Sequence, residues 1–308
     1  MFKHKPYKLA LVIGSGGIRS IVGVGVFQAL TEAGLEPDLI VGCSAGALFG
    51  AGLAEGNGSS AALRKAEKLW TAEVTQVTRW SAMPALFLSK FGFFKEDFSF
   101  KDYRVIADRI TKAFGDTQIQ DMPVAMRVTA THAASGRRVV LDKGSLVDAL
   151  CASSSIPFVF PPHKVNGQFL MDGVVSDPLP VMVASDAQTV VTIGVDSLMP
   201  RRINSPLKMF NRIFAATTNN LMQSQLELAR ASGMRVVHIT PKFTRHVHIF
   251  ETAAMTYLVE EARRATLDAL DEIRQHMEEA QADFSHQQAD HLAVVQKRSA
   301  APHLMHAH

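Results

Sequence analysis

The sequence has few cysteines and no long apolar run, and each absence excludes a class of protein. Its only cysteines, Cys43 and Cys151, cannot build a disulfide framework, and they suit a reducing compartment. No stretch reaches the roughly 18 uninterrupted apolar residues of a membrane-spanning helix. The apolar run at 9–13 is too short for the core of a signal peptide. We therefore expect a cytoplasmic protein that meets membranes only at their surface.

Signatures of metal, cofactor and nucleotide binding are also missing from the sequence. No acidic loop has the spacing of calcium ligands, and the histidines near the C-terminus lack metal-ligand spacing. The glycine-rich turn at 14–20 fails both nucleotide fingerprints. Arg19 stands where the dinucleotide motif needs glycine, and the Gly-Lys-Ser/Thr of a phosphate loop does not follow. The sequence predicts no metal, no cofactor and no nucleic-acid partner, and it leaves the oligomeric state open.

What is present is the composition of a globular protein that mixes strands and helices. The 308 residues are 47% hydrophobic and 20% charged, and the net charge of +3 is only mildly basic. Apolar strands at 8–13 and 37–41 each lead through a glycine-containing turn into a helix. This alternation predicts an α/β fold, with three layers (α/β/α) around a central, mostly parallel sheet.

The rest of the chain continues these patterns. Further strands are expected at 124–130, 138–141, 190–195 and 236–239, a hairpin at 165–170, and helices at 21–30, 47–54, 63–77, 146–153 and 252–277. After residue 280 the chain turns polar and histidine-rich. We expect one domain at 1–280, whose motifs lie at 8–195, followed by a disordered tail at 281–308.

The most informative segment is Gly-x-Ser-x-Gly at 42–46, directly after an apolar strand. A serine hydroxyl is a poor nucleophile unless a sharp turn presents it, and Gly42 and Gly46 leave room for such a turn. Ser44 would stand at the start of a helix, where backbone N–H groups favour negative charge. Taken alone, the pentapeptide fits a packing turn with an incidental serine equally well.

Two other segments could supply the remaining chemistry. The N–H groups of Gly16 and Gly17 would lie beside Ser44 at the ends of neighbouring parallel strands, where they could stabilise an oxyanion. Asp172 follows a buried strand and precedes Gly173. A carboxylate in an apolar setting has a raised pKa and is a better proton acceptor. On its own, an Asp-Gly pair more often closes a turn.

A Ser-Asp-His triad is the main alternative to a two-residue site. His238, His246 and His248 follow Asp172 in the chain order of the α/β-hydrolases. However, His238 falls in an apolar strand, where a core histidine is expected, and the other two lie in a charged loop. His163, beside a Pro-Pro turn, is a fourth candidate.

Four ordered blocks of this chain resemble the patatin-like phospholipases. They are the glycine-rich block at 14–19, Gly-Cys-Ser-Ala-Gly at 42–46, the Ala-Ser-Ser-Ser-Ile-Pro…Phe-Pro-Pro block at 152–162, and the Asp-Gly-Val…Asp-Pro-Leu-Pro block at 172–180. The resemblance runs from about residue 8 to residue 195. It departs from the usual family pattern at Ser20 and Val174, which both stand where the family often has glycine. Neither departure removes a reacting group.

The resemblance implies a fold, an activity and a set of residue roles. The fold would be the patatin-like α/β/α fold, and the activity hydrolysis of acyl lipids or phospholipids by a Ser44-Asp172 dyad. The oxyanion would be held by the Gly16 and Gly17 N–H groups. The remaining roles are support of the oxyanion loop or the substrate by Gly14, Ile18 and Arg19, room for the elbow at Gly42 and Gly46, and the relaxed position after the base at Gly173.

One further segment, at 83–94, is dense in large apolar residues and contains Lys90. Core packing is the ordinary meaning of such a segment, but an enzyme that acts on aggregated lipid needs an interfacial surface. Peripheral membrane contact through 83–94 is therefore a prediction. An acyltransferase that uses the same acyl-enzyme and a non-catalytic lipid-binding protein remain as alternatives to a hydrolase.

Overall fold

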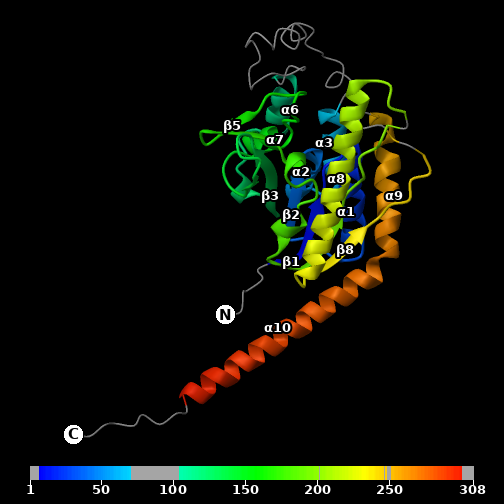
Figure 1. The fold of residues 1–308 in the computed structure, drawn as a ribbon. Helices are drawn as coiled ribbons and strands as arrows, with labels where there is room; N and C mark the ends of the chain where they lie inside the picture. Colours follow the sequence, from blue (N-terminus) through cyan, green and yellow to red (C-terminus); the bar gives the residue numbers. More distant parts are fainter. Residues whose placement is uncertain (1–6, 71–103, 201, 246, 248–250, 300–308) are drawn as a thin grey trace.

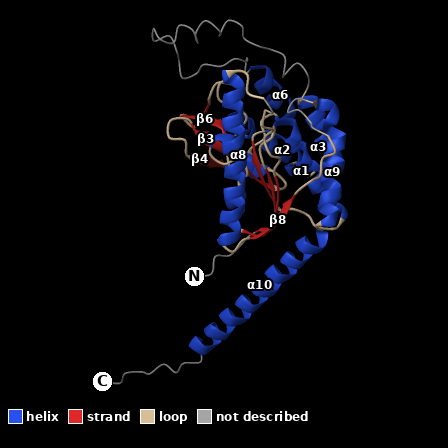
Figure 2. Ribbon diagram, turned by 45° about the vertical axis from the view of Figure 1, so that its right-hand side comes forward, coloured by secondary structure: helices blue, strands red, loops and turns tan. Residues whose placement is uncertain are grey.

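An eight-stranded sheet forms the centre of the protein (Figures 1 and 2). The computed structural model describes residues 7–70, 104–200, 202–245, 247 and 251–299. Along the sheet the strands follow the order β5-β6-β3-β2-β1-β7-β8, and β4 also pairs with β3. The strands are β1 (Tyr7–Ile13), β2 (Leu39–Cys43), β3 (Ala125–His132), β4 (Arg138–Leu141), β5 (His163–Val165), β6 (Gln168–Asp172), β7 (Ala187–Ile193) and β8 (Arg235–Ile239).

The pairing within the sheet is mostly parallel. Strands β3, β2, β1, β7 and β8 are parallel neighbours, whereas β4, β5 and β6 pair in antiparallel fashion. The β5–β6 hairpin turns at Asn166 and Gly167, which both have positive φ (48° and 83°) as a two-residue hairpin of this type requires. The predicted α/β class and the hairpin are confirmed.

Strand β3 carries β2 and β6 end to end along one of its edges. Cys43 of β2 pairs with Thr129, and Asp172 of β6 pairs with the next residue, Ala130. Strand β4 pairs with the same part of β3, from Val128 to Thr131, and so must occupy the opposite edge. Because β2 and β6 run in opposite directions, their carboxyl ends meet. The residue after Cys43 and the carboxylate of Asp172 are thereby placed side by side.

Helices cover both faces of the sheet because the central strands are apolar on both sides. In β1, Leu9, Leu11 and Ile13 pack on one face, whereas Ala10 and Val12 pack on the other. The first face is covered by α1 (Val22–Glu32), α2 (Ala45–Ala54), α3 (Ser59–Leu69), α6 (Arg104–Phe114), α7 (Leu146–Ser153) and α9 (Met255–Asp268). The second is covered by α8 (Pro206–Ala231) and the 3₁₀ turn η6 (Val181–Ala184). The three predicted layers are present.

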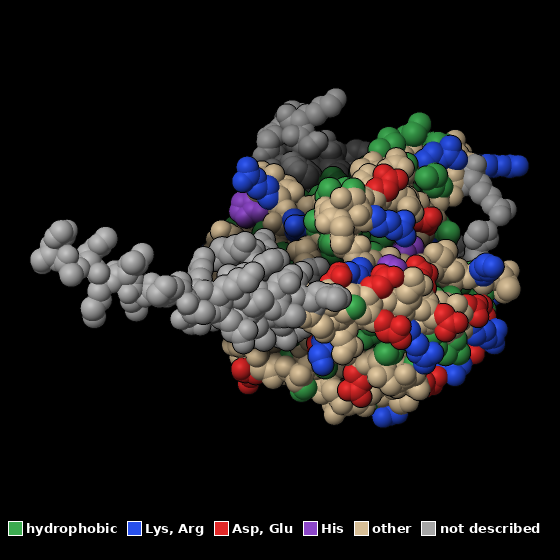
Figure 3. All heavy atoms as spheres, turned by 90° about the horizontal axis from the view of Figure 1, so that it is seen from below, with side chains coloured by type: hydrophobic (Ala, Val, Ile, Leu, Met, Phe, Trp, Pro, Cys, Tyr) green, Lys and Arg blue, Asp and Glu red, His purple; other side chains and the backbone are tan. Residues whose placement is uncertain are grey.

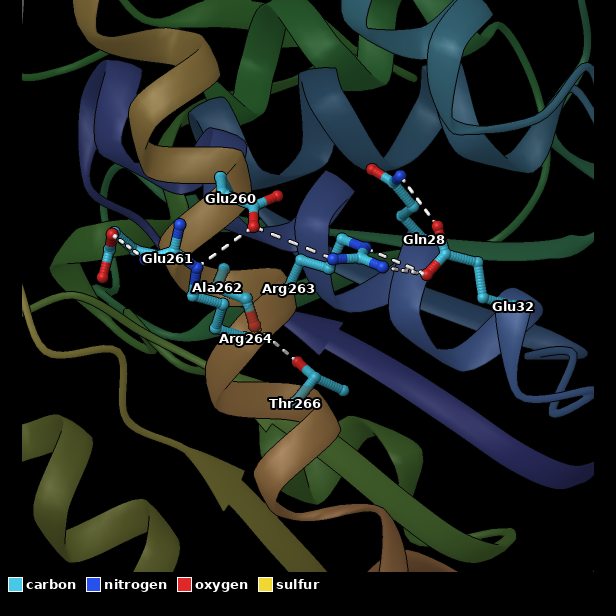
Figure 4. A network of polar contacts seen from close by, with 8 residues as sticks. All are labelled: Gln28, Glu32, Glu260, Glu261, Ala262, Arg263, Arg264 and Thr266. Carbon is cyan, nitrogen blue, oxygen red and sulfur yellow. Dashed lines mark hydrogen bonds and ion pairs between the residues drawn. The ribbon is translucent and has the colours of Figure 1, made fainter.

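Helices α1 and α9 pack against each other closely (Figure 4). A Cβ atom at Gly25 of α1 would lie 2.0 Å from the carbonyl oxygen of Val259 in α9, so the approach requires glycine there. At the edge of the contact, Arg263 forms an ion pair with Glu32 at 2.8 Å, and Glu32 also accepts a hydrogen bond from Gln28. This close contact explains why a buried helix contains glycine.

The predicted helix at 252–277 is wrong in one respect, because the structure divides it. A 3₁₀ turn, η7 (Thr252–Ala254), leads into α9, which ends before Ala269, and α10 (Leu270–Ser299) begins after it. Near the break, the Thr266 hydroxyl donates to the Ala262 carbonyl at 2.8 Å, a local bond that bends helices (Figure 4).

Helix α10 also corrects the expectation of a disordered tail. The structure is helical to Ser299, so residues 281–299 of the predicted tail belong to α10, which extends away from the sheet (Figure 1). The first part of α10 is anchored to the domain. Ile273 and Ala280 are buried, and Arg235 of β8 pairs with Asp283. A polar composition predicts disorder, but a helix that is anchored at one end can continue with few apolar residues.

Two other stretches differ from, or lie beyond, the sequence predictions. Helices α6 and α8 occupy segments for which the sequence pattern indicated no element. The predicted helix at 63–77 corresponds to α3, which ends at Leu69, and the predicted interfacial segment at 83–94 lies outside the described residues. In the part of the chain that the structure describes, no helix is both long and apolar enough to cross a membrane.

Candidate active site

Ser44 occupies a sharp turn between β2 and α2. Its backbone has φ 56° and ψ −128°, a strained conformation for a residue with a side chain. The two flanking glycines allow it. A Cβ atom at Gly42 would lie 2.4 Å from the Cα of Ala47, and one at Gly46 would lie 2.5 Å from the carbonyl oxygens of Ile13 and Gly14. The turn therefore has the geometry of a nucleophile elbow.

The Ser44 hydroxyl donates a 2.6 Å hydrogen bond to Oδ2 of Asp172. The two side chains are 128 residues apart in sequence, and they meet because β2 and β6 end at adjacent positions of β3. The other carboxylate oxygen, Oδ1, accepts the N–H of Val174 at 2.8 Å. Gly173 allows the chain to turn here, since a Cβ atom would lie 2.6 Å from the Thr129 carbonyl oxygen. Both oxygens of the carboxylate are thus held in place.

Burial governs the electrostatics of this pair. Asp172 is fully buried, and removal from water raises the pKa of its carboxyl group to about 7, although hydrogen bonds from Ser44 and from the Val174 N–H oppose the shift. A proton acceptor is most effective when its pKa lies near the working pH. The carboxylate is therefore poised to exchange a proton near neutrality.

The glycine-rich loop lies beside the elbow at the end of β1. The Gly14 N–H donates to the carbonyl of Ile193 and the Ser15 N–H to that of Pro178. Gly17 has φ 61°, which glycine adopts without strain, and begins the 3₁₀ turn η1 (Gly17–Ile21). Among the described residues no acceptor takes the N–H of Gly16 or Gly17. Within the described structure, these two backbone donors therefore have no partner.

The side chains of the loop hold it in position. Ile18 is buried, and the Arg19 guanidinium donates to the carbonyl of Asp196 at 2.8 Å, which ties the loop to the segment after β7. The Nε of Arg19 has no partner among the described residues. Ser20, which stands where glycine is usual in the family that this chain resembles, donates its hydroxyl to the Gly14 carbonyl at 2.9 Å. The serine therefore adds a hydrogen bond across the loop.

Ser153 is a site residue to which the sequence pattern gave no role. Its hydroxyl oxygen accepts the backbone N–H of Ser44 at 2.7 Å, and the side chain is fully buried at the end of α7. In the same segment, the Ser155 carbonyl accepts the N–H of Asp172 at 2.9 Å. The serine run at 153–155 thus holds the backbone of both Ser44 and Asp172. The only available signal was the presence of this run in a motif block.

The histidines of the proposed triad are not brought to Ser44 in the described part of the structure. His238 lies in β8, which β1 and β7 separate from β2. Three strand spacings place it roughly 14 Å away across the sheet. His163 in β5 bonds to Asp148 at 2.9 Å. His246 and His248 lie outside the described residues.

The structure also shows the position of the Cys43 thiol and the grouping of side chains that could bind a metal. Cys43 is a buried free thiol, as expected for the residue before an elbow serine, and burial raises its pKa. Among the residues that the structure describes, no three His, Cys, Asp or Glu side chains gather in a way that could hold a metal ion.

Comparison with known proteins gives a consistent match. A family model described as patatin-like phospholipase matches residues 11–185, a range that contains both Ser44 and Asp172. An uncharacterized NTE family protein of Mycobacterium tuberculosis is 33% identical over 189 residues, which cover 61% of this chain and 48% of that protein. Patatin-like phospholipase domain-containing protein 7 of Rattus norvegicus is 32% identical over 191 residues, which cover 61% of this chain and 13% of that protein.

The match to solved structures is weaker. VipD from Legionella pneumophila aligns with a TM-score of 0.47 and 15% identity, over 87% of this chain and 67% of that chain. The chain spans about half, or less, of the length of the curated relatives that it matches.

Proposed function

Because the chain belongs to the patatin-like phospholipase family, we propose that it is a serine lipid acyl hydrolase, which cleaves carboxylic ester bonds of phospholipids or related acyl lipids. The observation that carries this proposal is the buried 2.6 Å hydrogen bond from Ser44 to Asp172. It joins a nucleophile on a strained turn to a carboxylate whose pKa is about 7.

The reaction would proceed through an acyl-enzyme. Asp172 takes the hydroxyl proton as Ser44 Oγ forms a bond to the acyl carbonyl carbon, and it returns that proton to the alcohol oxygen as the ester C–O bond breaks. In the second half, Asp172 takes a proton from water as the water oxygen forms a bond to the acyl carbon. Asp172 then gives that proton to Ser44 Oγ as the bond between Oγ and the acyl carbon breaks, which releases the carboxylic acid and restores Ser44. A single carboxylate thus serves as base and acid in turn.

The negative charge on the carbonyl oxygen needs a separate site. The free N–H groups of Gly16 and Gly17 are the candidates, since the Gly14, Arg19 and Ser20 contacts hold their loop beside the elbow. Backbone donors that are fixed before the reaction stabilise an oxyanion by about 10²–10³ in rate each. This loop makes the transition state, rather than the substrate, the better-bound species.

The first experiment tests the dyad itself. The full chain is treated with a fluorophosphonate probe and assayed on short-chain soluble esters and on phospholipids, beside Ser44→Ala and Asp172→Asn. Both variants should fold and lose hydrolysis by a factor of at least about 10³. Only the wild type should label strongly, because its Ser44 is activated.

Matched controls separate the dyad from the alternatives. His238→Ala and His163→Ala should retain hydrolysis, and loss of activity in either, with Asp172→Asn active, would establish a triad instead. No labelling of Ser44, beside a labelled control hydrolase, would favour a non-catalytic lipid-binding protein. Capture of the acyl group by an added alcohol in preference to water would favour an acyltransferase.

A further inference from the structure

Exposed apolar side chains cluster at one end of α8. Of the twelve large hydrophobic side chains that are exposed among the described residues, seven belong to three neighbouring segments. We call these seven the docking patch. They are Phe158 from the loop after α7, Leu198, Met199 and Ile203 from the loop before α8, and Met209, Phe210 and Ile213 from the first turns of α8.

Specific contacts join the three segments into one surface. Phe158 and Phe210 meet edge to face with ring centroids 6.0 Å apart. The Arg212 guanidinium donates to the Pro200 carbonyl at 2.5 Å, and the Ser197 N–H donates to the Asn219 side chain at 2.7 Å. These bonds hold the loop before α8 against the helix. Exposed apolar side chains gathered in this way are uncommon on a protein that has no partner to cover them.

In α8, the exposure of large apolar side chains is greatest in its N-terminal turns. Further along α8, Met222, Leu226 and Ala229 are buried against the sheet, so the helix packs in the ordinary way there. At its N-terminal end, Met209 and Ile213 are four residues apart and therefore share a face, which is exposed. Ile213 has 58% of its surface exposed.

Phe158 is held outward by a strained backbone. Its φ is 67°, which is a rare and strained conformation for a bulky residue. The side chain is nevertheless 46% exposed. Strain that persists without burying the side chain is typical of a residue whose outward position has a function.

The docking patch adjoins the candidate active site. Phe158 lies five residues after Ser153, which binds the N–H of Ser44. Leu198 lies two residues after Asp196, whose carbonyl holds Arg19. Leu198 and Arg19 also line one cavity of about 320 Å³. In Figure 1 this N-terminal end of α8 lies at the top of the molecule, away from the end where α10 departs.

Basic residues predominate in the segments that carry the docking patch, although the exposed Asp196 directly precedes one of them. Residues 197–226 contain no Asp or Glu but include Arg201, Arg202, Lys208 and Arg212, and residues 149–171 contain Lys164 and no acidic residue. By contrast, acidic and basic side chains are interspersed over the face shown in Figure 3. An apolar surface flanked by basic residues complements an anionic lipid bilayer, whose headgroups attract Lys and Arg while its interior accepts apolar side chains.

We propose that the docking patch binds the surface of an anionic phospholipid bilayer and places Ser44 at the membrane. The placing of Ser44 at the membrane rests on the proposed lipid hydrolase function, whereas binding of the docking patch to the bilayer requires no catalysis. This site consists of described residues, and the predicted contact through 83–94, outside them, stays a separate prediction. Phe158, Phe210 and Ile213 would enter the interface, and Arg202 and Lys208 would contact the headgroups.

The test measures vesicle binding separately from hydrolysis. The full chain with Ser44→Ala, which leaves the lipid intact, is sedimented with vesicles of phosphatidylcholine alone or mixed with phosphatidylglycerol. We expect binding to the mixed vesicles that weakens as salt is added. Phe210→Glu with Ile213→Glu should lower the partition coefficient about tenfold or more. Arg202→Glu with Lys208→Glu should lower it by roughly fivefold for each positive charge that is removed, and only on anionic vesicles.

Leu228→Glu is the matched control. Leu228 is 50% exposed on the same helix, fifteen residues beyond Ile213. The Leu228→Glu variant should bind vesicles as well as the Ser44→Ala protein from which it is made. Equal binding by the Phe210/Ile213 variant, or an equal loss in Leu228→Glu, would overturn the proposal. So would a wild-type dimer that binds no vesicles and that the Phe210/Ile213 substitutions dissociate, because the patch would then be a contact between two copies.

Hydrolysis of a soluble short-chain ester by the patch variants, in an otherwise wild-type chain, supplies the second measurement. Its retention shows that the fold and the dyad are intact. Absence of this activity in the wild type would count against the proposed function, whereas absence of vesicle binding counts against the docking patch alone.

Discussion

The Asp172 carboxylate is costly to bury, and the protein compensates only part of that cost. Ser44 and the Val174 N–H each donate one hydrogen bond to it, but no described cation pairs with it. Asp177, five residues later, is also buried but forms a 2.5 Å ion pair with Arg138. A carboxylate that pairs with a cation is suited to stabilising the fold. A carboxylate without a paired cation, whose pKa lies near 7, is suited to proton transfer.

The first prediction at this scale concerns the pH dependence of catalysis. Only ionised Asp172 can accept the Ser44 proton, so kcat on a soluble ester should rise with pH and level off above a midpoint near 7, the pKa of the carboxyl group. The slope below the midpoint should be that of a single titrating group. A rate that is constant from about pH 5 to pH 9 would contradict the role of Asp172 as base.

At the scale of elements, α2 begins where it does because its first turn presses on β1. Gly46 meets the carbonyl oxygens of Ile13 and Gly14, whereas Gly52, later in the same helix, is in ordinary contact with Ala62 at 3.5 Å. Gly46 is thus a glycine that the elbow needs, whereas Gly52 of the same helix is not.

These two glycines make a matched pair of variants. Gly46→Ala should lower the stability by about 1–3 kcal/mol, because backbone must move, and should reduce kcat by displacing Ser44. Gly52→Ala should leave kcat unchanged and stabilise the protein by up to about 1 kcal/mol, because alanine favours a helix. Denaturant unfolding and ester hydrolysis measure the two effects. Equal behaviour of the variants would refute the assigned contact.

At the scale of the whole molecule, the raised pKa of Asp172 links catalysis to stability. The carboxyl group titrates near 3.8 when unfolded and near 7 when folded. Below about pH 4 it is protonated in both states and has no effect. Between these values the unfolded chain binds fewer protons, so this group lowers stability as pH rises, and above about pH 7 the loss is complete.

Asp172→Asn should therefore be inactive but more stable than the wild type. The difference in unfolding free energy should be near zero at about pH 4 and should grow to roughly 4 kcal/mol by about pH 8. Urea unfolding of both proteins across this range measures it. A variant that is less stable than the wild type at high pH would show that the ionised carboxylate supports the fold instead.

Much of this protein can be predicted from local sequence. Short-range patterns predicted β1, β2, the elbow and the Asn166-Gly167 hairpin, because a strand period and a glycine spacing are properties of consecutive residues. The same local evidence failed for α8, whose apolar residues are divided between a buried half and the docking patch. It also failed for the break at Ala269 and for the helical part of the C-terminal segment.

The sequence alone determined that Ser44 and Asp172 were candidates, but the tertiary structure decided that they meet. Their contact depends on β2 and β6 ending at Thr129 and Ala130 of a third strand, a register that no local pattern contains. The roles of Ser153 and of Arg19, and the clustering of Phe158 with Phe210, depend on long-range packing in the same way. The sequence specifies residue types and their spacings directly, whereas the distances between residues remote in sequence are set only when the sheet forms.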